Sequence, residues 1–461
     1  MPRADLQLTN FTSGELSPRL FGRTDLGRYF NGAGLIRNFI VHPHGGLTRR
    51  PGTYFSAEVK NSLLFTRLIP FEFSTVEAYV LELGNLYVRF YANQGQIQSG
   101  GSPYEIVSPW STSQLVDLKF TQSADIIYVC HPDVRPKQIN RFSDTSWTIT
   151  NYEFRDGPYL SLNTDATKTL TSSVTAIGAS GTLTATGHTP FASTDVGRLV
   201  RLKVGANWGW GEITAYTSPT QVTWTVKGTV GGLSASADWR LGAWSDTTGW
   251  PACASFYEER LCFGYTDNRP SNVWGSASGD FTSHAPSAAD GTVRDDDALD
   301  FQIADDRVNA IRWISGGRDL LIGTQGAEYL ITGGPNSPLT PTNLQVKRQT
   351  TYGSYAAALP QRLGASTMFI QRAGRKVREL AFNFEVDGYR APDLTILSEH
   401  ISKSGFVDID YQQEPDSILW NVRADGFLSG MTFEKEQEVI AWHGHDIGGT
   451  FGNGLAIVES I

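Results

Sequence analysis

Two pairs of histidines, each separated by one residue, are the first candidates for chemistry in this sequence. His42 and His44 lie in NFIVHPHGGLTRRPG, and His443 and His445 lie in WHGH. Histidines at i and i+2 of an extended strand face the same side and could supply two zinc ligands. A third ligand is missing near the first pair, and Pro43 favours a stiff turn. We therefore expect no metal at either pair, and a turn at the second.

Carboxylates offer a second kind of chemistry. Asp295–Asp297 form the one dense acidic run, with Asp300 close behind, but the glycine-punctuated spacing of a calcium loop is absent, so we expect a solvated loop. A glycosidase needs two carboxylates that face each other across a sugar. Asp408, Asp410 and Asp425 are candidates that the sequence cannot place in one pocket, and Asp425 already suits a hairpin turn because a glycine follows it.

Sequence motifs of enzymes are lacking. The sequence has no Gly-x-Ser-x-Gly elbow, no His-Glu-x-x-His and no phosphate-binding glycine loop. We expect no catalytic residue, no bound metal and no cofactor. The formal net charge of −9 also argues against a general nucleic-acid-binding surface, although an acidic channel could let nucleic acid slide through.

Composition and cysteine usage indicate an all-β protein that folds in a reducing compartment. Aromatic and β-branched residues are plentiful beside 47 Gly and only 3 Met. Cys130, Cys253 and Cys262 are too few for a disulfide scaffold; the last two either pair across a hairpin or are buried thiols. No signal peptide and no apolar run of about 18 residues is present, so we expect a soluble protein without stable membrane insertion.

A repeated hairpin organises the chain. An aliphatic strand, a short turn and an aromatic-rich strand recur from residues 78, 126, 253, 319, 367 and 417. Most starting points are about 48 residues apart, which is the length of a four-stranded propeller blade. The sequence therefore predicts an all-β fold, a β-propeller with four-stranded blades of about 48 residues, an inserted small β-domain and an extended N-terminal arm.

Two longer steps locate insertions and set the expected domain bounds. The Thr- and Ser-rich residues 163–245 suggest an inserted β-sandwich or barrel, whose tryptophans are either its core or an outward binding surface. Residues 276–300 suggest a long surface loop that could act as a gate. The rest is an arm and docking segment (1–60) and two propeller parts (61–162 and 246–461). A further hairpin would be due just beyond residue 461, so the second part is either incomplete at its end or closed by another segment.

Several segments, in one order along the chain, resemble the tail nozzle family of short-tailed bacteriophages, also known as tail tubular protein B-like or stabilisation proteins. The resemblance covers nearly the whole chain outside the insertion. The segments are Phe11–Phe55, Ser271–Phe281, Asn309–Ile314, Leu339–Ser354, Val377–Ile401 and Gln412–His445. Members of this family as a rule extend beyond the position of this C-terminus.

The resemblance implies a structural virion protein and its partners. It implies a homo-oligomeric ring, expected to be a hexamer. This ring would belong to the portal-tail complex, lie below the head-to-tail connector and contact tail fibre or spike proteins. Double-stranded DNA would pass through its channel without sequence specificity, retained before infection and released at DNA ejection. The chain would be assembled in the host bacterial cytoplasm and reside in the virion tail; the sequence does not identify the channel-lining residues.

The arm is the expected assembly element. FTSGELSPRLFGRTD is rich in Gly, Pro and charge and cannot bury a core of its own, so we expect a neighbouring subunit or the connector to order it. In NFIVHPHGGLTRRPG, the paired glycines predict a tight turn and the paired arginines hydrogen bonds to carbonyls or carboxylates. The expected docking residues are Phe11, Glu15, Pro18, Arg19, Arg23, Asp25, Arg49, Arg50 and Pro51.

One alternative from another functional class stays open. Propellers often carry sugar sites, so the chain could instead be a carbohydrate-binding or carbohydrate-cleaving propeller that recognises a host receptor. That hypothesis predicts a pocket of tryptophans and carboxylates on a monomer or trimer. Ring stoichiometry distinguishes the two hypotheses.

Overall fold

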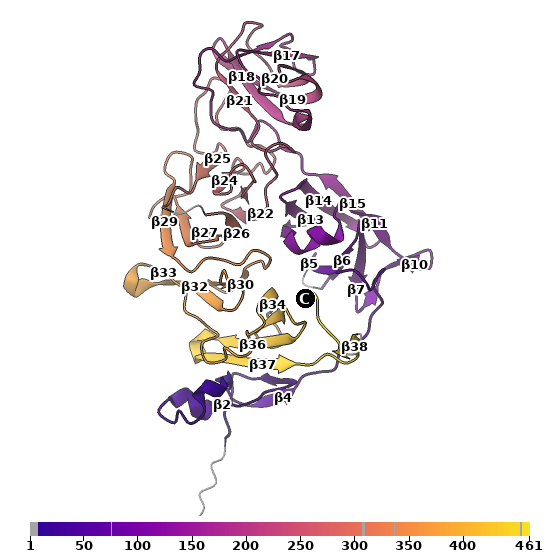
Figure 1. The fold of residues 1–461 in the computed structure, drawn as a ribbon, viewed down its shortest axis with the longest axis vertical. Coiled ribbons are helices and arrows are strands. Elements are labelled where there is room, and N and C mark those ends of the chain that lie inside the picture. Colours follow the sequence, from indigo (N-terminus) through magenta and orange to yellow (C-terminus); the bar gives the residue numbers. More distant parts are fainter. Residues whose placement is uncertain (1–7, 75, 307–308, 336, 452–453) are drawn as a thin grey trace, which may run out of the picture. The chain divides into compact units, whose positions relative to one another are not determined.

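The computed structural model describes residues 8–74, 76–306, 309–335, 337–451 and 454–461. These residues form short β-strands, and the helical segments among them are 3-10 turns. Most strands belong to four-stranded antiparallel sheets in which strands consecutive in the chain are neighbours (Figure 1). Such a meander is the construction of a propeller blade. The predicted fold class, an all-β propeller protein with four-stranded blades, is confirmed.

The chain divides into two compact units: unit 1 comprises residues 1–116 and 349–461, and unit 2 comprises residues 117–348. The seven N-terminal residues of the expected arm lie outside the described residues. The blades of unit 1 contain β5 (Arg67–Glu72), β6 (Ala78–Gly84), β7 (Tyr87–Ala92) and β11 (Glu105–Val107); β30 (Gln361–Leu363), β31 (Ser366–Ile370), β32 (Val377–Asn383) and β33 (Gly388–Arg390); and β34 (Phe406–Gln412), β35 (Ile418–Arg423), β36 (Leu428–Glu434) and β37 (Val439–His445).

Short strands complete unit 1. β8 (Gly95–Gln96) pairs with β7, and three two-stranded ladders are formed by β1 (Gly14–Glu15) with β2 (Gly32–Ala33), by β9 (Gln98–Ser99) with β10 (Ser102–Pro103), and by β38 (Thr450–Phe451) with β39 (Gly454–Leu455). A hairpin of β3 (Phe39–Val41) and β4 (Leu47–Arg49) lies in the N-terminal segment.

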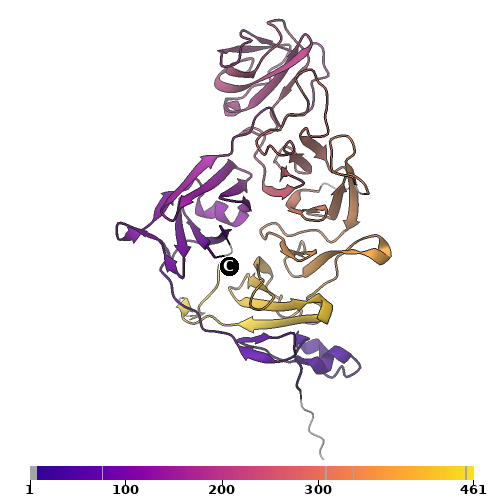
Figure 2. The same cartoon turned by 180° about the vertical axis from the view of Figure 1, so that it is seen from behind.

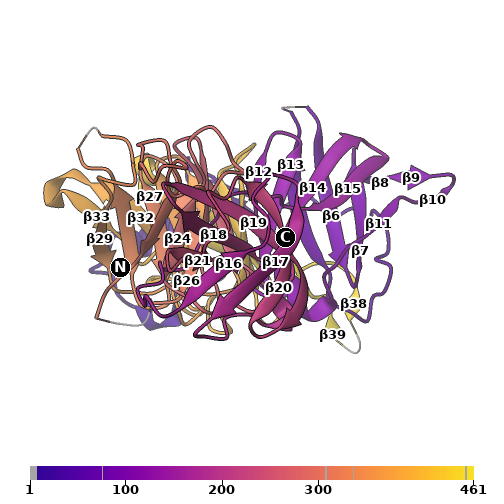
Figure 3. The ribbon, with the colours of Figure 1, turned by 90° about the horizontal axis from the view of Figure 1, so that it is seen from above.

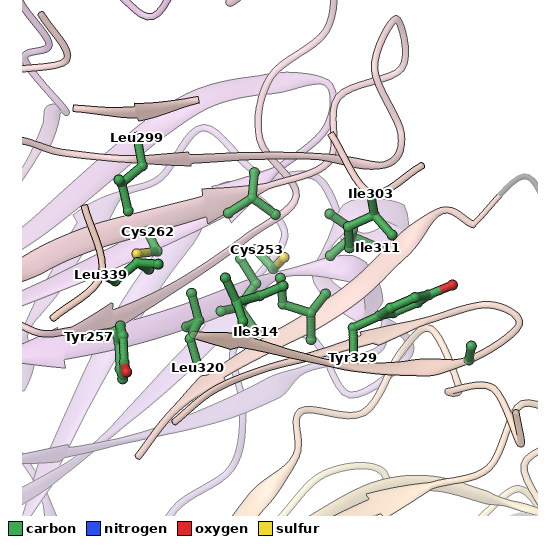
Figure 4. Close-up of a cluster of buried hydrophobic side chains, with 14 residues drawn as sticks. Cys253, Tyr257, Cys262, Leu299, Ile303, Ile311, Ile314, Leu320, Tyr329 and Leu339 are labelled. Atoms are coloured by element: carbon green, nitrogen blue, oxygen red, sulfur yellow. The ribbon is translucent and has the colours of Figure 1, made fainter. Parts of the chain in front are cut away.

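Unit 2 has blades of the same construction. They contain β12 (Lys119–Ser123), β13 (Ile126–His131), β14 (Val134–Ser143) and β15 (Ser146–Asn151); β22 (Cys253–Tyr257), β23 (Arg260–Gly264), β24 (Asn272–Gly275) and β25 (Leu299–Gln302); and β26 (Ile311–Gly316), β27 (Leu320–Thr324), β28 (Glu328–Thr332) and β29 (Gln345–Thr350), which runs just past the end of the unit. Apolar side chains of the last two blades form a shared core that includes Cys253, Cys262, Ile314 and Leu320 (Figure 4).

Each hairpin predicted from the sequence forms two neighbouring strands of one blade; five of the six are the central pair, and β22–β23 is the first pair of its blade. The pairs are β6–β7, β13–β14, β22–β23, β27–β28, β31–β32 and β35–β36. Central strands are covered on both faces, and all five residues of β27 and of β31 are buried. Burial on both faces explains why these strands are the most apolar parts of the sequence.

The inserted β-domain is a small closed barrel. Its strands follow the order β16 (Thr169–Ser172), β17 (Ser180–Thr186), β20 (Gln221–Gly228), β19 (Asn207–Ser218), β18 (Leu199–Val204) and β21 (Trp239–Leu241). Leu170 of β16 and Ser236, which lies three residues before β21, exchange both backbone hydrogen bonds at 2.9 Å, and this bridge closes the sheet. The barrel contains its own core, with Trp224 fully buried in it.

Of the two alternatives for the tryptophans of the insertion, the structure supports a role in packing and not an outward binding surface. Trp224 is buried and donates to Ser172 Oγ at 3.1 Å, and Trp239 donates to the carbonyl of Lys168 at 3.0 Å. Trp208 and Trp210 are only partly exposed, and Trp210 packs against a cluster of the adjoining blades. Large aromatic side chains thus stabilise the insertion instead of extending from it.

The long connection between β24 and β25 is anchored, which corrects the expectation of a free surface loop. His284 is buried, and its Nε2 lies 3.0 Å from the hydroxyl of Tyr152. Arg260 donates to the carbonyls of Asp295 at 2.8 Å and Asp297 at 2.6 Å, so the backbone of the acidic run is fixed although the side chains of Asp295 and Asp296 are exposed. These bonds tie both ends of the connection and leave it unsuited to act as a gate.

The C-terminal residues link the first and last blades of unit 1. Ser460 Oγ accepts from the backbone N–H of Leu68 on β5 at 3.1 Å and donates to Asp408 Oδ2 on β34 at 3.1 Å. Burial raises the pKa of Asp408, and its partner Arg67 opposes that shift. The two blades are therefore joined through a third segment and not by a shared ladder.

Candidate docking pocket beside the N-terminal segment

The N-terminal segment (residues 8–50) lies along β37, the outer strand of the last blade of its own unit (Figures 1 and 2). Arg37 bridges Gly444 in parallel, and Asn38 N–H donates to the Gly444 carbonyl at 2.8 Å. Gly14 has φ +66°, and a Cβ there would lie 2.2 Å from the backbone nitrogen of Trp442. Only glycine allows this approach. The expectation that a neighbouring subunit orders the arm is therefore wrong for these residues, because their own chain orders them.

The β3–β4 hairpin contains the first histidine pair. Gly45 has φ +96° and Gly45 N–H donates to the carbonyl of His42 at 2.9 Å, which confirms the predicted tight turn. Nδ1 of His42 lies 3.0 Å from Asp416 Oδ1 and its Nε2 lies 2.6 Å from Thr48 Oγ1, while His44 is exposed. Both ring nitrogens of His42 are thus occupied by side chains of the fold.

Glu15 fastens the segment to a loop that follows β33. Its side chain is buried; Oε2 accepts from the backbone N–H of Ile36 at 2.8 Å, and Oε1 lies 2.7 Å from Nε2 of His400. The Glu15 carbonyl accepts from Ser398 Oγ at 2.6 Å, and Ser17 N–H donates to the Leu397 carbonyl at 2.7 Å. A predicted docking residue is therefore used inside the chain.

A cavity of about 630 Å³ opens where this loop, the β31–β32 turn and the 3-10 turn Pro18–Leu20 meet. We call it the arm pocket. Two of the predicted docking residues, Pro18 and Arg19, line it. Its walls comprise Ser17, Pro18, Arg19, Gln371, Ala373, Arg375, Lys376, Asp393, Thr395, Ile396, Glu399, His400, Ser402 and Lys403.

The arm pocket has an excess of positive charge. Arg19 pairs with Glu399 at 2.7 Å and Lys376 pairs with Asp393 at 2.6 Å, and the bond from Lys376 helps to lower the pKa of Asp393 against its burial. The remaining cations, Arg375 and Lys403, are exposed, and neither side chain has an acidic partner among the described residues. Two unpaired cations at the rim of a cavity favour an anionic ligand.

One residue that lines the arm pocket has a buried ring nitrogen, and another exposes an apolar side chain. Nδ1 of His400 is buried and has no hydrogen-bond partner among the described residues. Ile396 exposes 66% of its surface beside Pro18. The pocket thus combines apolar and cationic surface, which suits a segment that is both apolar and acidic.

The other predicted docking residues do not gather at this pocket. Arg23 and Asp25 pair with each other at 2.7 Å on the surface, and each shifts the other's pKa, raising that of the guanidinium and lowering that of the carboxyl. Arg50 donates to the carbonyl of Asp446 at 3.1 Å, as the paired arginines predict. The remaining three are Phe11, which packs against the small core under the arm, and Arg49 and Pro51, which are exposed.

The second histidine pair does not lie in a turn, which corrects the prediction. His443 and His445 are buried in β37, with Nδ1 of His443 lying 2.6 Å from Nε2 of His445. Burial lowers the pKa of His445 to about 3 and that of His443 well below its usual value. Neutral imidazoles can share one hydrogen bond, and here the pair stabilises the strand.

The other residues considered as candidates for chemistry, three cysteines and two aspartates, have structural roles in the fold. Cys130, Cys253 and Cys262 are buried free thiols, so the disulfide alternative is wrong. Asp425 lies in the β35–β36 turn, where Gly426 has φ +76°, and its carboxylate pairs with Arg423. Burial raises the pKa of Asp410. Among the described residues no group of three or more His, Cys, Asp and Glu could hold a metal ion, and no helix could cross a membrane.

Sequence reasoning missed Arg375, Ile396, His400 and Lys403. These residues lie in two turns that follow β31 and β33, and only the fold brings them together. No local signal in the sequence could have found them, because Ile396 stands among Leu394, Leu397 and Ile401 and only the fold shows that its side chain is exposed.

No protein-family model matches this chain, and no curated protein does so. Among solved structures, a protein from Lactobacillus plantarum aligns over 76% of this chain and 88% of its own at 10% identity, with a TM-score of 0.33. Apo AztD from Citrobacter koseri aligns over 77% of this chain and 79% of its own at 8% identity, with a TM-score of 0.34. Likenesses at these TM-scores say nothing of what this chain does.

Proposed function

We propose that this chain is a structural protein of a bacteriophage virion. Its copies form the tail nozzle, a ring of six below the head-to-tail connector that conducts double-stranded DNA. The ring retains packaged DNA before infection and lets it pass at ejection. The proposal rests on the series of segments along the chain that resemble the nozzle family, and on the propeller blades that this resemblance implies.

One structural observation carries the assembly role. Residues 8–64 expose large apolar side chains at a higher density than the rest of the described chain, and five of these side chains belong to residues 8–50, which lie on β37. Exposed apolar surface on an ordered segment marks an interface with another protein. The side chains are Leu8, Phe21, Phe30, Leu35, Phe39, Tyr54, Phe55, Leu63 and Leu64.

The charge of the chain agrees with passage of DNA. With a net charge of −9 the ring as a whole repels phosphates, so DNA is not held by counterion release at every base pair. The glycan-binding alternative called for a pocket of tryptophans, but the arm pocket has none and the tryptophans of the insertion are buried or half-buried. The nozzle is the function that this arrangement supports best.

Negative-stain electron microscopy of the purified chain, alone and mixed with the connector of the same virus, tests this proposal. We expect closed rings with a central hole that stack coaxially on connector rings. Leu63→Ser and Leu35→Ser remove exposed apolar side chains and should weaken stacking or ring closure, whereas Ile177→Ser, an exposed residue of the barrel, is the matched control. Single particles without a hole in both samples would contradict the proposal.

A further inference from the structure

The turn between β32 and β33 presents an apolar and acidic tip. Phe384 is 90% exposed and Val386 is 47% exposed, and the acidic residues Glu385 and Asp387 alternate with them. The turn is a 3-10 helix, Phe384–Val386, and Asn383 Oδ1 accepts from Val386 N–H at 3.2 Å. Asp387 closes it in the left-handed conformation with φ +45°. We call residues 384–387 the finger; it projects at the end of its hairpin (Figures 1 and 3).

A phenylalanine this exposed on an ordered turn indicates a surface that contacts another protein. Burying its ring against an apolar surface would stabilise a complex, because the ring would then leave water. The capping bond and the left-handed residue fix the backbone, so little ordering entropy would be lost when the finger binds. The finger is thus preorganised to insert a ring flanked by two negative charges.

The arm pocket has the complementary character. Its apolar surface at Ile396 and Pro18 suits an aromatic ring, and its unpaired cations, Arg375 and Lys403, suit the carboxylates beside that ring. The charges match in number, since the finger has two acidic groups and the pocket two cations without acidic partners among the described residues. Complementarity of both kinds favours one specific contact.

The finger cannot reach the arm pocket of its own chain. β32 starts directly after the turn that lines the pocket, Gln371–Lys376, and ends directly before the finger. Seven residues of strand span about 23 Å, so pocket and finger lie at opposite ends of one blade. A contact between them must join two copies, and because the two surfaces differ it is heterologous, the type of contact that generates rings when the rotation closes.

We propose that the finger of one copy inserts into the arm pocket of the next, with Phe384 against Ile396 and Pro18, and with Glu385 and Asp387 paired with Arg375 and Lys403. This contact rests on the proposed ring and names the surfaces that build it. The occupant of the pocket is thus a second copy of this chain.

Charge-reversed variants test the contact. Variant one is Glu385→Lys with Asp387→Lys, and variant two is Arg375→Glu with Lys403→Glu. All four side chains are exposed, so both variants should fold, which circular dichroism and thermal melting check. Each variant alone should self-associate on the order of 100-fold more weakly than the wild type, because its finger and its pocket then have charges of the same sign. An equimolar mixture should restore rings in which the two variants alternate, because every finger then meets a pocket of opposite charge.

Native mass spectrometry with sedimentation gives the result for each sample. The matched control Arg294→Glu reverses an exposed cation outside the pocket and should assemble as the wild type does. If both variants form wild-type rings on their own, the finger contact is wrong while the nozzle ring stands. If each variant is monomeric but the mixture does not recover, the pairing of these charges is wrong. A wild type that stays monomeric at every concentration, both alone and with the connector added, contradicts both proposals.

Discussion

Nε2 of His400 lies 2.7 Å from Oε1 of Glu15, so a buried carboxylate from the N-terminal segment is bound to a loop near the end of the chain. The same carboxylate accepts the backbone N–H of Ile36. One side chain therefore holds together two parts of the arm and one wall of the arm pocket. This contact makes the pocket dependent on the position of the arm.

Removing this carboxylate should destabilise unit 1. In Glu15→Ala the buried Ile36 N–H and the His400 ring lose their partner, and we expect the free energy of unfolding to fall by about 2–4 kcal/mol. Glu399→Ala is the control, since its pair with Arg19 is largely exposed and should contribute less than about 1 kcal/mol. Urea denaturation measures both, and equal effects of the two substitutions would refute the role of Glu15.

The close approach of Gly14 to β37 gives a second prediction. Gly14→Ala places a methyl group against the backbone of Trp442 at a residue with positive φ, so the arm must move. We expect a loss of at least about 2 kcal/mol and faster hydrogen exchange at the amides of Leu16 and Asn38. Gly46→Ala meets no atom within 4 Å and should leave exchange unchanged. Unaltered exchange in Gly14→Ala would show that the arm is not seated on β37.

The three thiols should be unreactive in the folded protein. All are buried, and burial raises the pKa of Cys253 to about 11 and that of Cys262 to about 12, while the pKa of Cys130 is also raised. A thiol reagent at pH 8 should label none of them in native buffer and all three in guanidinium chloride. Rapid labelling of the native protein would indicate that these blades open readily.

The buried imidazole of His284 should make stability depend on pH. Burial lowers its pKa to about 3, whereas in the unfolded chain it binds a proton below about 6.5. Between these values the unfolded state holds more protons, so stability is complete above about pH 6.5 and is lost as pH falls towards 3. His284→Gln should reduce the slope of unfolding free energy against pH by roughly 1.4 kcal/mol per pH unit.

The slope of unfolding free energy against pH is compared between His284→Gln and the wild type. Parallel curves for His284→Gln and the wild type between pH 6 and 4 would show that His284 is not buried in its neutral form.

The hairpins could be predicted because their signals are local. In AYVLELGNLYVRFY, apolar residues on each side of one Gly-Asn turn suffice to define β6 and β7. Blade length followed from repetition of that pattern. Fold class needed no knowledge of distant contacts.

The errors came from residues whose role depends on distant partners. His443 and His445 look polar in sequence but share a hydrogen bond inside β37, and the β24–β25 connection looks like a free loop until Arg260 and His284 fix it. The arm pocket was out of reach for the same reason: its unpaired cations Arg375 and Lys403 come from two turns that only the fold joins. Local sequence does not contain such pairings.

The mass of the purified particle, measured by native mass spectrometry together with images of the same sample, tests the central claim most directly. The nozzle account predicts a closed ring of about six copies, each of 50.6 kDa, with a central hole. A compact monomer that binds glycans and does not close into a ring when the connector is added would contradict it.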